Sequence, residues 1–351
     1  MAQQTHSADT NQPQSVQNSM HTQQSAAMRP DASSLFDQDV SQVVRTKRTL
    51  PLKLIAVVAA VLVVACVAWF AQPHKADVAK KGTKDNPVVV GVVGANDPQW
   101  RTFVDEAQKQ GIYVELKNFT DYTSENPALA QGSLDLNEFQ HILYLANYNV
   151  KNDQDLQPIG GVAIYPLGLY SKQFKAKEEI PANTTVTIPN DETNQARALG
   201  VLESAGLIKI KNGWTPFVTP RDIDKEHSRV HVQPVEAAKV ANSLSDPSVS
   251  AAVINNDYIK DAGIKAQDAL FRDSAETDTA KPYVNVWVSR KEDANNETYK
   301  KLVEIWHSDA VSKALSDKLD NTGVLNNDSP EALQETLEKT QEALKASLAS
   351  K

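Results

Sequence analysis

Arg197 is the side chain whose type and position best suit the binding of an anion. It falls in the first turns of a predicted helix that follows Asn190 and Asp191, where unpaired backbone amides and the helix dipole favour negative charge. Its planar guanidinium can hold a carboxylate through two parallel hydrogen bonds. The alternative is a surface arginine that pairs with a nearby glutamate such as Glu192.

Three asparagines stand where predicted strands would end at a cleft. Asn255 and Asn256 follow the apolar run 251–254, and Asn285 lies between two valines. An amide can donate to a carboxylate and accept from an ammonium group. Turn formation is the alternative for the first pair. Asn285 needs a polar partner more strongly, because an amide is disfavoured within a β-branched strand.

An aromatic group made of Tyr122, Phe139, His141 and Tyr144 could receive an apolar or thioether side chain. Contacts between sulfur and an aromatic ring contribute about 0.3 to 1.5 kcal/mol. The stretch 139–144 is expected to be helical, with Phe139 and Leu143 on one face and His141 and Tyr144 on another. The alternative is an aromatic core patch with one hydrogen-bonded histidine.

Motifs for catalysis, nucleotide binding or metal binding are weak. The sequence lacks a Gly-x-Ser-x-Gly elbow and a Walker loop, and His227 and His231 lack the glutamate of a zinc protease helix. A hydrolase using His141 with Glu138 or Asp135 remains an alternative, although no nucleophile is positioned to complete it. We therefore predict no enzyme activity, no cofactor and no metal site.

The elements that would position these side chains begin with a β-branched strand at 88–93. Asp97 and Pro98 then provide an N-cap and a first-turn proline for an amphipathic helix, which Gly111 would end. A second strand is expected at 112–116. A strand, a helix and a strand at this spacing form a βαβ unit, which is typical of an α/β fold with ligand sites at the carboxyl ends of strands.

The pattern recurs in the second half of the chain. We expect a strand at 185–188 and a helix at 193–205 closed by Gly206, and further strands and helices at 251–254, 284–288, 298–307 and 330–351. Two sets of units suggest two lobes with a ligand site at their seam. The predicted first lobe comprises 87–184 plus 286–351, and the second comprises 185–285.

The N-terminal part has a different composition. Residues 1–50 are polar and are predicted to form a disordered cytoplasmic tail. The segment 51–72 contains an uncharged apolar run long enough for a transmembrane helix or signal anchor. Basic residues just before it favour a cytoplasmic N-terminus and an extracytoplasmic remainder on the cell membrane. Residues 73–86 would form a flexible tether.

Cys66, the only cysteine, excludes an internal disulfide and a thiolate metal cluster. It ends the sequence Val63-Val-Ala-Cys66, which loosely resembles a bacterial lipobox, so lipidation is one interpretation. A small apolar residue inside a transmembrane helix is the other. The formal net charge of −8 argues against a nucleic-acid partner, because phosphate binding requires a clustered basic surface.

Six motifs together resemble the methionine-binding lipoprotein family, the substrate-binding components of bacterial ATP-binding-cassette (ABC) methionine importers. The resemblance runs from about Pro87 to Leu315. It rests on Phe119-Thr-Asp-Tyr122, Asn137-Glu-Phe139-Gln-His141, Tyr165-Pro-Leu-Gly-Leu-Tyr170-Ser171, the stretch Ile188 to Leu199, Ala205-Gly-Leu-Ile208 and Tyr283-Val-Asn285-Val.

The resemblance implies a two-lobed periplasmic-binding-protein-like fold of type II, with an ABC permease, its ATPase subunit and the membrane as partners. It also implies that L-methionine or a related amino acid is held by Tyr122, Phe139, His141, Tyr144, Asn194, Arg197, Asn255 and Asn285. Arg197 would bind the carboxylate, Asn255 and Asn285 the rest of the amino-acid backbone, and the aromatic group the side chain.

The chain departs from the family pattern at Ile142-Leu143, where a basic residue and proline usually stand, and at Asp257, where asparagine is common. These departures leave open a receptor for a different small amino acid or a short peptide. A third alternative is a surface interaction protein that uses its glutamine-rich tail or its terminal helix.

Overall fold

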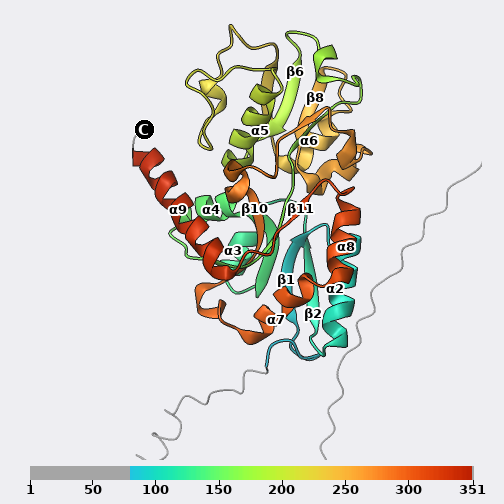
Figure 1. Ribbon diagram of the computed structural model, residues 1–351, viewed down its shortest axis with the longest axis vertical. Helices are drawn as coiled ribbons and strands as arrows, with labels where there is room; N and C mark the ends of the chain where they lie inside the picture. Colours follow the sequence, from blue (N-terminus) through green and yellow to red (C-terminus); the bar gives the residue numbers. More distant parts are fainter. Residues whose placement is uncertain (1–79, 350–351) are drawn as a thin grey trace, which may run out of the picture. The chain divides into compact units, whose positions relative to one another are not determined.

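The computed structural model describes residues 80–349 (Figure 1). The predicted tail 1–50, the apolar segment 51–72, Cys66 and the first part of the tether lie outside these residues. Among the described helices, none combines the length and apolar character needed to span a bilayer. The described part contains helices and two β-sheets, which confirms the α/β class.

The first sheet has six strands in the order β11-β4-β10-β3-β1-β2. Strand β1 runs parallel to β2 and β3, whereas β10 and β11 are antiparallel to their neighbours. The strands are β1 (Val88–Val93), β2 (Val114–Phe119), β3 (Leu136–His141), β4 (Gln157–Ile164), β10 (Val284–Ser289) and β11 (Val324–Leu325). The parallel pairs bring the carboxyl ends of β1, β2 and β3 to one edge.

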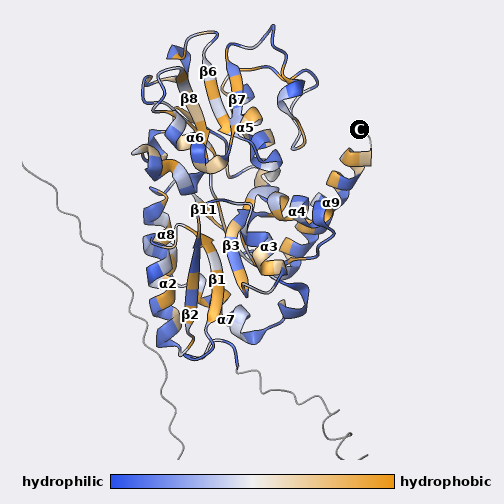
Figure 2. Cartoon of the chain, turned by 180° about the vertical axis from the view of Figure 1, so that it is seen from behind, coloured by the Kyte–Doolittle hydropathy of each residue, from blue (hydrophilic) through white to orange (hydrophobic). Residues whose placement is uncertain are grey.

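Helices cover both faces of this sheet (Figure 1): α2 (Pro98–Lys109), α7 (Glu297–Trp306) and α8 (Asp309–Lys318) on one side, and α3 (Glu125–Ala130), α4 (Ile142–Asn152) and α9 (Pro330–Ala349) on the other. The first side is centred on Trp100, Phe103, Trp287 and Trp306, whose ring centroids lie 4.7 to 6.0 Å apart. Figure 2 shows β1 as mostly apolar and β3 as a mixture of polar and apolar residues.

The second sheet has five strands in the order β7-β6-β8-β5-β9. Its strands are β5 (Gly168–Tyr170), β6 (Thr185–Pro189), β7 (His231–Val235), β8 (Val249–Ile254) and β9 (Phe271–Arg272). Strand β6 is parallel to β7 and β8, and β5 is antiparallel to β8 and β9. Helices α5 (Glu192–Ser204) and α6 (Ala237–Ser243) pack on it around two apolar clusters.

Two connections join the sheets. The chain leaves the first sheet through residues 165–167, between β4 and β5, and returns through 273–283, between β9 and β10. Strand β5 therefore pairs in the second sheet, although residues 168–170 fall within the range expected for the first lobe. Hydrogen bonds between strands decide which sheet β5 joins, and the local sequence does not reveal them.

The predicted start of the second strand is wrong. Strand β2 begins at Val114 rather than at Ile112, because the backbone N–H of Ile112 donates to Ala107 O at 3.0 Å and completes the end of helix α2. Gly111 has a φ of +76°, the left-handed conformation that commonly terminates helices. The predicted helix end is therefore correct, and the strand starts only after this turn.

Candidate ligand-binding site

A small cavity with a volume of about 30 Å³ lies where side chains of the two sheets meet. All eight predicted site residues line it: Tyr122, Phe139, His141, Tyr144, Asn194, Arg197, Asn255 and Asn285. Five further residues, absent from the predicted set, also line it: Gln140, Tyr165, Leu167, Asn256 and Asp257.

Strand ends and helix starts position these side chains. Phe139 and His141 are the last alternate residues of β3, and Tyr144 is in the first turn of α4. The expectation that 139–144 forms one helix is therefore wrong, because the chain stays extended as far as His141. Asn194 lies at the start of α5, whose N-cap is Asp191. The carboxyl ends of parallel strands thus converge on the cavity.

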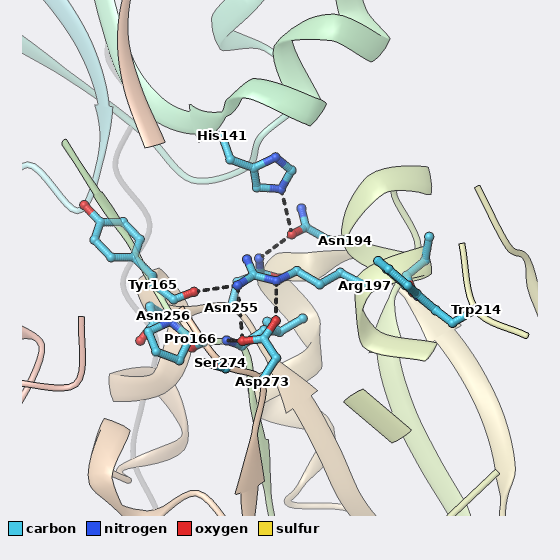
Figure 3. A network of polar contacts seen from close by, with 12 residues as sticks. His141, Tyr165, Pro166, Asn194, Arg197, Trp214, Asn255, Asn256, Asp273 and Ser274 are labelled. Carbon is cyan, nitrogen blue, oxygen red and sulfur yellow. Dashed lines mark hydrogen bonds and ion pairs between the residues drawn. The ribbon is translucent and has the colours of Figure 1, made fainter. Parts of the chain in front are cut away.

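Arg197 is buried between the sheets, with a side-chain exposure of 6% (Figure 3). Its Nε donates to Asp273 Oδ2 at 2.7 Å, and its Nη2 donates to Asp273 Oδ1 at 3.3 Å and to Tyr165 O at 2.9 Å. The proposed alternative, a surface pair with Glu192, is wrong, because Glu192 pairs with Lys151. The hydrogen bonds that the guanidinium makes to described residues leave Nη1 available to a ligand.

His141 is neutral and held in one tautomer. Its Nδ1 accepts the backbone N–H of Tyr144 at 3.1 Å, which caps helix α4. The proton therefore resides on Nε2, which points toward Asn194 Oδ1 at 3.4 Å. Burial, with a contribution from the charge of Arg197, lowers the pKa of His141 to about 3. A histidine whose only basic nitrogen is already occupied is poorly suited to general-base catalysis.

The carboxylates paired with His141 in the hydrolase alternative do not line the cavity. Asp135 instead binds Lys81 at 2.8 Å and accepts the backbone N–H of Val89. Glu138 is buried beside the site, where desolvation and the charge of Asp257 raise its pKa to about 8. The arrangement therefore lacks the connected acid and base that hydrolysis would require.

Three of the four cavity asparagines, Asn194, Asn255 and Asn285, have different hydrogen-bonding states. Asn194 Oδ1 accepts from Asn255 Nδ2 at 2.9 Å, and Asn194 Nδ2 donates to Asp191 (Figure 3). Asn255 Oδ1 is buried and has no hydrogen-bond partner within residues 80–349. The side-chain amide of Asn285 likewise makes no hydrogen bond to any described residue. These groups face the cavity as an acceptor and as an amide able to donate and accept.

An aromatic wall closes the other end of the cavity and consists of Tyr122, Phe139 and Tyr144. The ring of Tyr122 lies 5.9 Å from that of Phe139, which lies 5.7 Å from that of Tyr144. Tyr144 Oη donates to the backbone oxygen of Tyr122 at 2.8 Å, and Tyr122 Oη donates to Asp257 Oδ2 at 2.7 Å. The hydroxyl groups are thus satisfied, and the ring faces remain for an apolar group.

Sequence reasoning missed the side chains that hold Arg197 in place. Asp273 lies in the connection between β9 and β10, and Tyr283 lies at its end, with its ring centroid 4.3 Å from Arg197 Cζ. Tyr165 contributes a backbone oxygen, and it begins one of the motifs already quoted. No local pattern marks Asp273, because its partner is 76 residues away in the sequence.

The cavity therefore offers one guanidinium nitrogen, two amide groups and an aromatic wall in an enclosed space. This combination suits a small molecule with a carboxylate, a hydrogen-bond donor and an apolar group. Within residues 80–349, no group of three or more histidine, cysteine, aspartate or glutamate side chains is arranged to hold a metal ion.

Comparison with known proteins shows which family this chain matches. Residues 88–327 match the family described as NlpA lipoprotein. The D-methionine-binding lipoprotein MetQ of Yersinia pestis is 35% identical over 232 residues, which cover 65% of this chain and 84% of that protein.

Solved structures agree with the family match. Protein PG110 from Staphylococcus aureus has a TM-score of 0.67 and 35% identity, covering 71% of this chain and 99% of its own. A nutrient binding protein from Burkholderia cenocepacia, solved bound to methionine, has a TM-score of 0.63 and 31% identity, covering 68% and 99%. Both the sequence match and the fold match thus span the two sheets, and the chain belongs to the NlpA lipoprotein family.

Proposed function

We propose that this protein captures methionine or a close analogue outside the cytoplasm and delivers it to an ABC importer. The relatives are named for methionine binding, and one of the similar structures holds methionine. The protein is accordingly a binding protein that performs no chemistry on its ligand. Its partners are the amino acid, a membrane permease and the ATPase subunit that drives transport.

The observation that carries this proposal is the match between unsatisfied polar groups in the cavity and the groups of a zwitterionic amino acid. Arg197 Nη1 and the amide nitrogen of Asn285 would bind the ligand carboxylate. Asn255 Oδ1, buried and without a partner in the described part of the chain, would accept a hydrogen bond from the ammonium group. The ligand would thus supply the partners that these groups lack.

The aromatic wall would then receive the ligand side chain. Tyr122, Phe139 and Tyr144 are largely buried and present ring faces, which suit a polarisable thioether more than a charged group. Each favourable sulfur contact would add about 0.3 to 1.5 kcal/mol. Selectivity would therefore come from the shape of the wall, while affinity for amino acids in general would come from the polar end.

The anchoring and lobe boundaries are part of the same proposal. The segment 51–72 would hold the protein at the cell membrane, either as a transmembrane helix or through lipidation of Cys66, with the binding domain on the extracytoplasmic face. The two sheets would form the lobes of a type II binding-protein fold. The pairing of β5 supports assigning residues 168–184 to the second lobe.

Isothermal titration calorimetry on the full-length protein in detergent would test this function, after unfolding and refolding to remove bound ligand. We expect L-methionine or D-methionine to bind more tightly than the other amino acids. Arg197→Ala should weaken binding by at least about 2 kcal/mol, because it removes one partner of a buried charge pair. Arg221→Ala is the matched control, since Arg221 is exposed and outside the cavity.

Three outcomes would contradict the proposal in whole or in part. Tight binding of a different amino acid would keep the receptor function and remove the assignment to methionine. Binding of none of the amino acids would overturn the proposed function as a whole. Wild-type affinity in Arg197→Ala would show that the carboxylate is bound elsewhere.

A further inference from the structure

Asp257 is a cavity residue whose hydrogen bonds and ion pairs to other described residues cross the seam between the sheets. It lies in the 3-10 segment Asn256–Ala262, which follows β8 of the second sheet. Its Oδ2 accepts from Tyr122 Oη at 2.7 Å, and its Oδ1 lies 3.4 Å from Lys318 Nζ. Tyr122 follows β2 and Lys318 ends α8, so both partners belong to the first sheet and its helices.

Asp257 therefore depends on the first lobe for its partners. The hydrogen bonds and ion pairs of its carboxylate within the described residues involve only Tyr122 and Lys318. The side chain is only 18% exposed in this arrangement. A carboxylate this well shielded from water needs compensation, and here compensation exists only while the lobes are together.

Lys318 is the complementary half of the contact. Its side chain is 6% exposed, and its second partner is Asp97 Oδ2 at 3.5 Å, within its own lobe. Burial alone would lower the pKa of Lys318, but the charges of Asp257 and Asp97 leave that pKa raised. The lysine thus stays charged, and separation of the lobes would remove one of the two carboxylates with which it forms ion pairs.

We propose that Asp257 and Lys318 form a latch that holds the two lobes closed over the ligand. This inference rests on the proposed function, to which it adds a residue that determines affinity without recognising the ligand. Every ligand that allows closure gains the same contribution from the latch. Because Tyr122 also bonds to Asp257, closure sets the position of one ring of the aromatic wall at the same time.

A second ion pair across the seam provides an internal comparison. Lys260, in the same 3-10 segment as Asp257, lies 2.7 Å from Asp97 Oδ1. Its side chain is 58% exposed, so water and salt screen this pair. It connects the same lobes as the latch does, but from the surface, and it should contribute little.

Asp257→Asn in the full-length protein is the test, because the amide keeps the size and an oxygen for Tyr122 while removing the charge opposite Lys318. We expect the dissociation constant to rise by about tenfold for every ligand that the wild type binds, chiefly through faster release. Lys318→Met should act similarly. The double variant should lose less than the product of the two single effects, because the residues act as a pair.

The matched control is Lys260→Gln, which removes the exposed pair and should change affinity less than about twofold. Titration calorimetry would give the dissociation constants, and stopped-flow tryptophan fluorescence would give the release rates. An unchanged dissociation constant in Asp257→Asn would overturn the latch. A change confined to some ligands would overturn it as well, since that result indicates direct contact between Asp257 and those ligands.

A measurement without ligand separates the latch from the proposed function. Spin labels at Gln110→Cys and Glu226→Cys, in a Cys66→Ser background, would report the distance between exposed sites on the two lobes. Asp257→Asn should shift the ligand-free protein toward longer distances. An identical distance distribution would overturn the latch. Failure of the wild type to bind any amino acid would instead overturn the proposed function, whatever the distances show.

Discussion

Arg197 illustrates how a buried charge is prepared for a ligand. Asp273 engages two of its nitrogens, and the ring of Tyr283 lies beneath the guanidinium. An arginine held in this way loses little side-chain freedom when a carboxylate binds. The two hydrogen bonds to Asp273 fix the orientation of the guanidinium, so Asp273 would position Arg197 for the proposed ligand contact.

Asp273→Asn should weaken amino-acid binding by about tenfold while Arg197 remains present, because the neutral amide no longer orients or compensates the guanidinium. Titration calorimetry would measure the loss, and circular dichroism would check folding. Glu192→Gln is the matched control, since it removes an exposed pair with Lys151 outside the cavity. Equal affinities for Asp273→Asn and the wild type would contradict the positioning role.

Glu138 makes stability depend on pH. Burial and the charge of Asp257 raise its pKa from 4.5 to about 8, so the folded protein keeps a proton that the unfolded chain releases between these values. Stability should therefore fall as pH rises from 4.5 to 8, with up to about 1.4 kcal/mol per pH unit from this group. Glu138→Gln should show a shallower decline in urea unfolding between pH 5 and 8. Parallel slopes for the two proteins would refute this expectation.

Helix α9 lies beyond the part of the chain that matches the family and packs against the first sheet and its helices. It begins at Pro330, beyond the family match that ends at residue 327, and it buries Leu333, Leu337 and Leu344. Leu333 and Leu337 join the apolar cluster that contains Ile142 and Leu145 of α4. The terminal helix predicted at 330–351 therefore docks against the body of the protein.

Leu337→Ala should reduce the free energy of unfolding by about 2 to 5 kcal/mol, because the side chain is fully buried and its loss leaves a cavity. Leu348→Ala, on the same helix but 44% exposed, should change it by less than about 0.5 kcal/mol. Urea unfolding followed by circular dichroism would measure both. Similar values for the two variants would mean that α9 does not pack as described.

The boundary between β3 and α4 shows why local pattern alone misplaced one element. The sequence Phe-Gln-His-Ile-Leu-Tyr at 139–144 shows no clear hydrophobic period, and either helix or strand accommodates it. Pairing with β1 and β10 keeps β3 extended, and the His141 ring then caps the helix that follows. Hydrogen bonds within the sheet thus determine that β3 is a strand, because its residues have no clear preference for helix or strand.

At the scale of the whole molecule, two sheets joined by short connections enclose the cavity. The connections 165–167 and 273–283 carry the groups that hold Arg197, so the segments that link the lobes also organise the site. Contacts such as Tyr122 with Asp257 and His141 with Asn194 join the two halves around it. Ligand binding and lobe closure should consequently be coupled.

Thermal unfolding of the full-length protein should report this coupling. A ligand present at about 100 times its dissociation constant should add about 2.7 kcal/mol to stability, which corresponds to several degrees in Tm. Methionine should produce this rise, and glutamate, whose charged side chain would meet the aromatic wall, should not. A larger rise in Tm with glutamate than with methionine would contradict the proposal that the aromatic wall receives the ligand side chain.

The sequence by itself determined the α/β class, five of the strands and four of the helices of the described part, and eight of the thirteen residues that line the cavity. These follow from local information: β-branched runs, capping residues, helix-ending glycines and motifs that remain together in the chain. It also marked Arg197 as the candidate for binding a carboxylate, because a helix start and an arginine form a local pattern.

Only the tertiary structure decided which partners complete the site. Asp273 and Lys318 reach their partners across 76 and 61 residues, and β5 joins the second sheet through pairing with β8 and β9. The neutral state of His141 likewise depends on burial between the lobes. Charge compensation, strand pairing and desolvation arise between distant segments, so no local pattern encodes them.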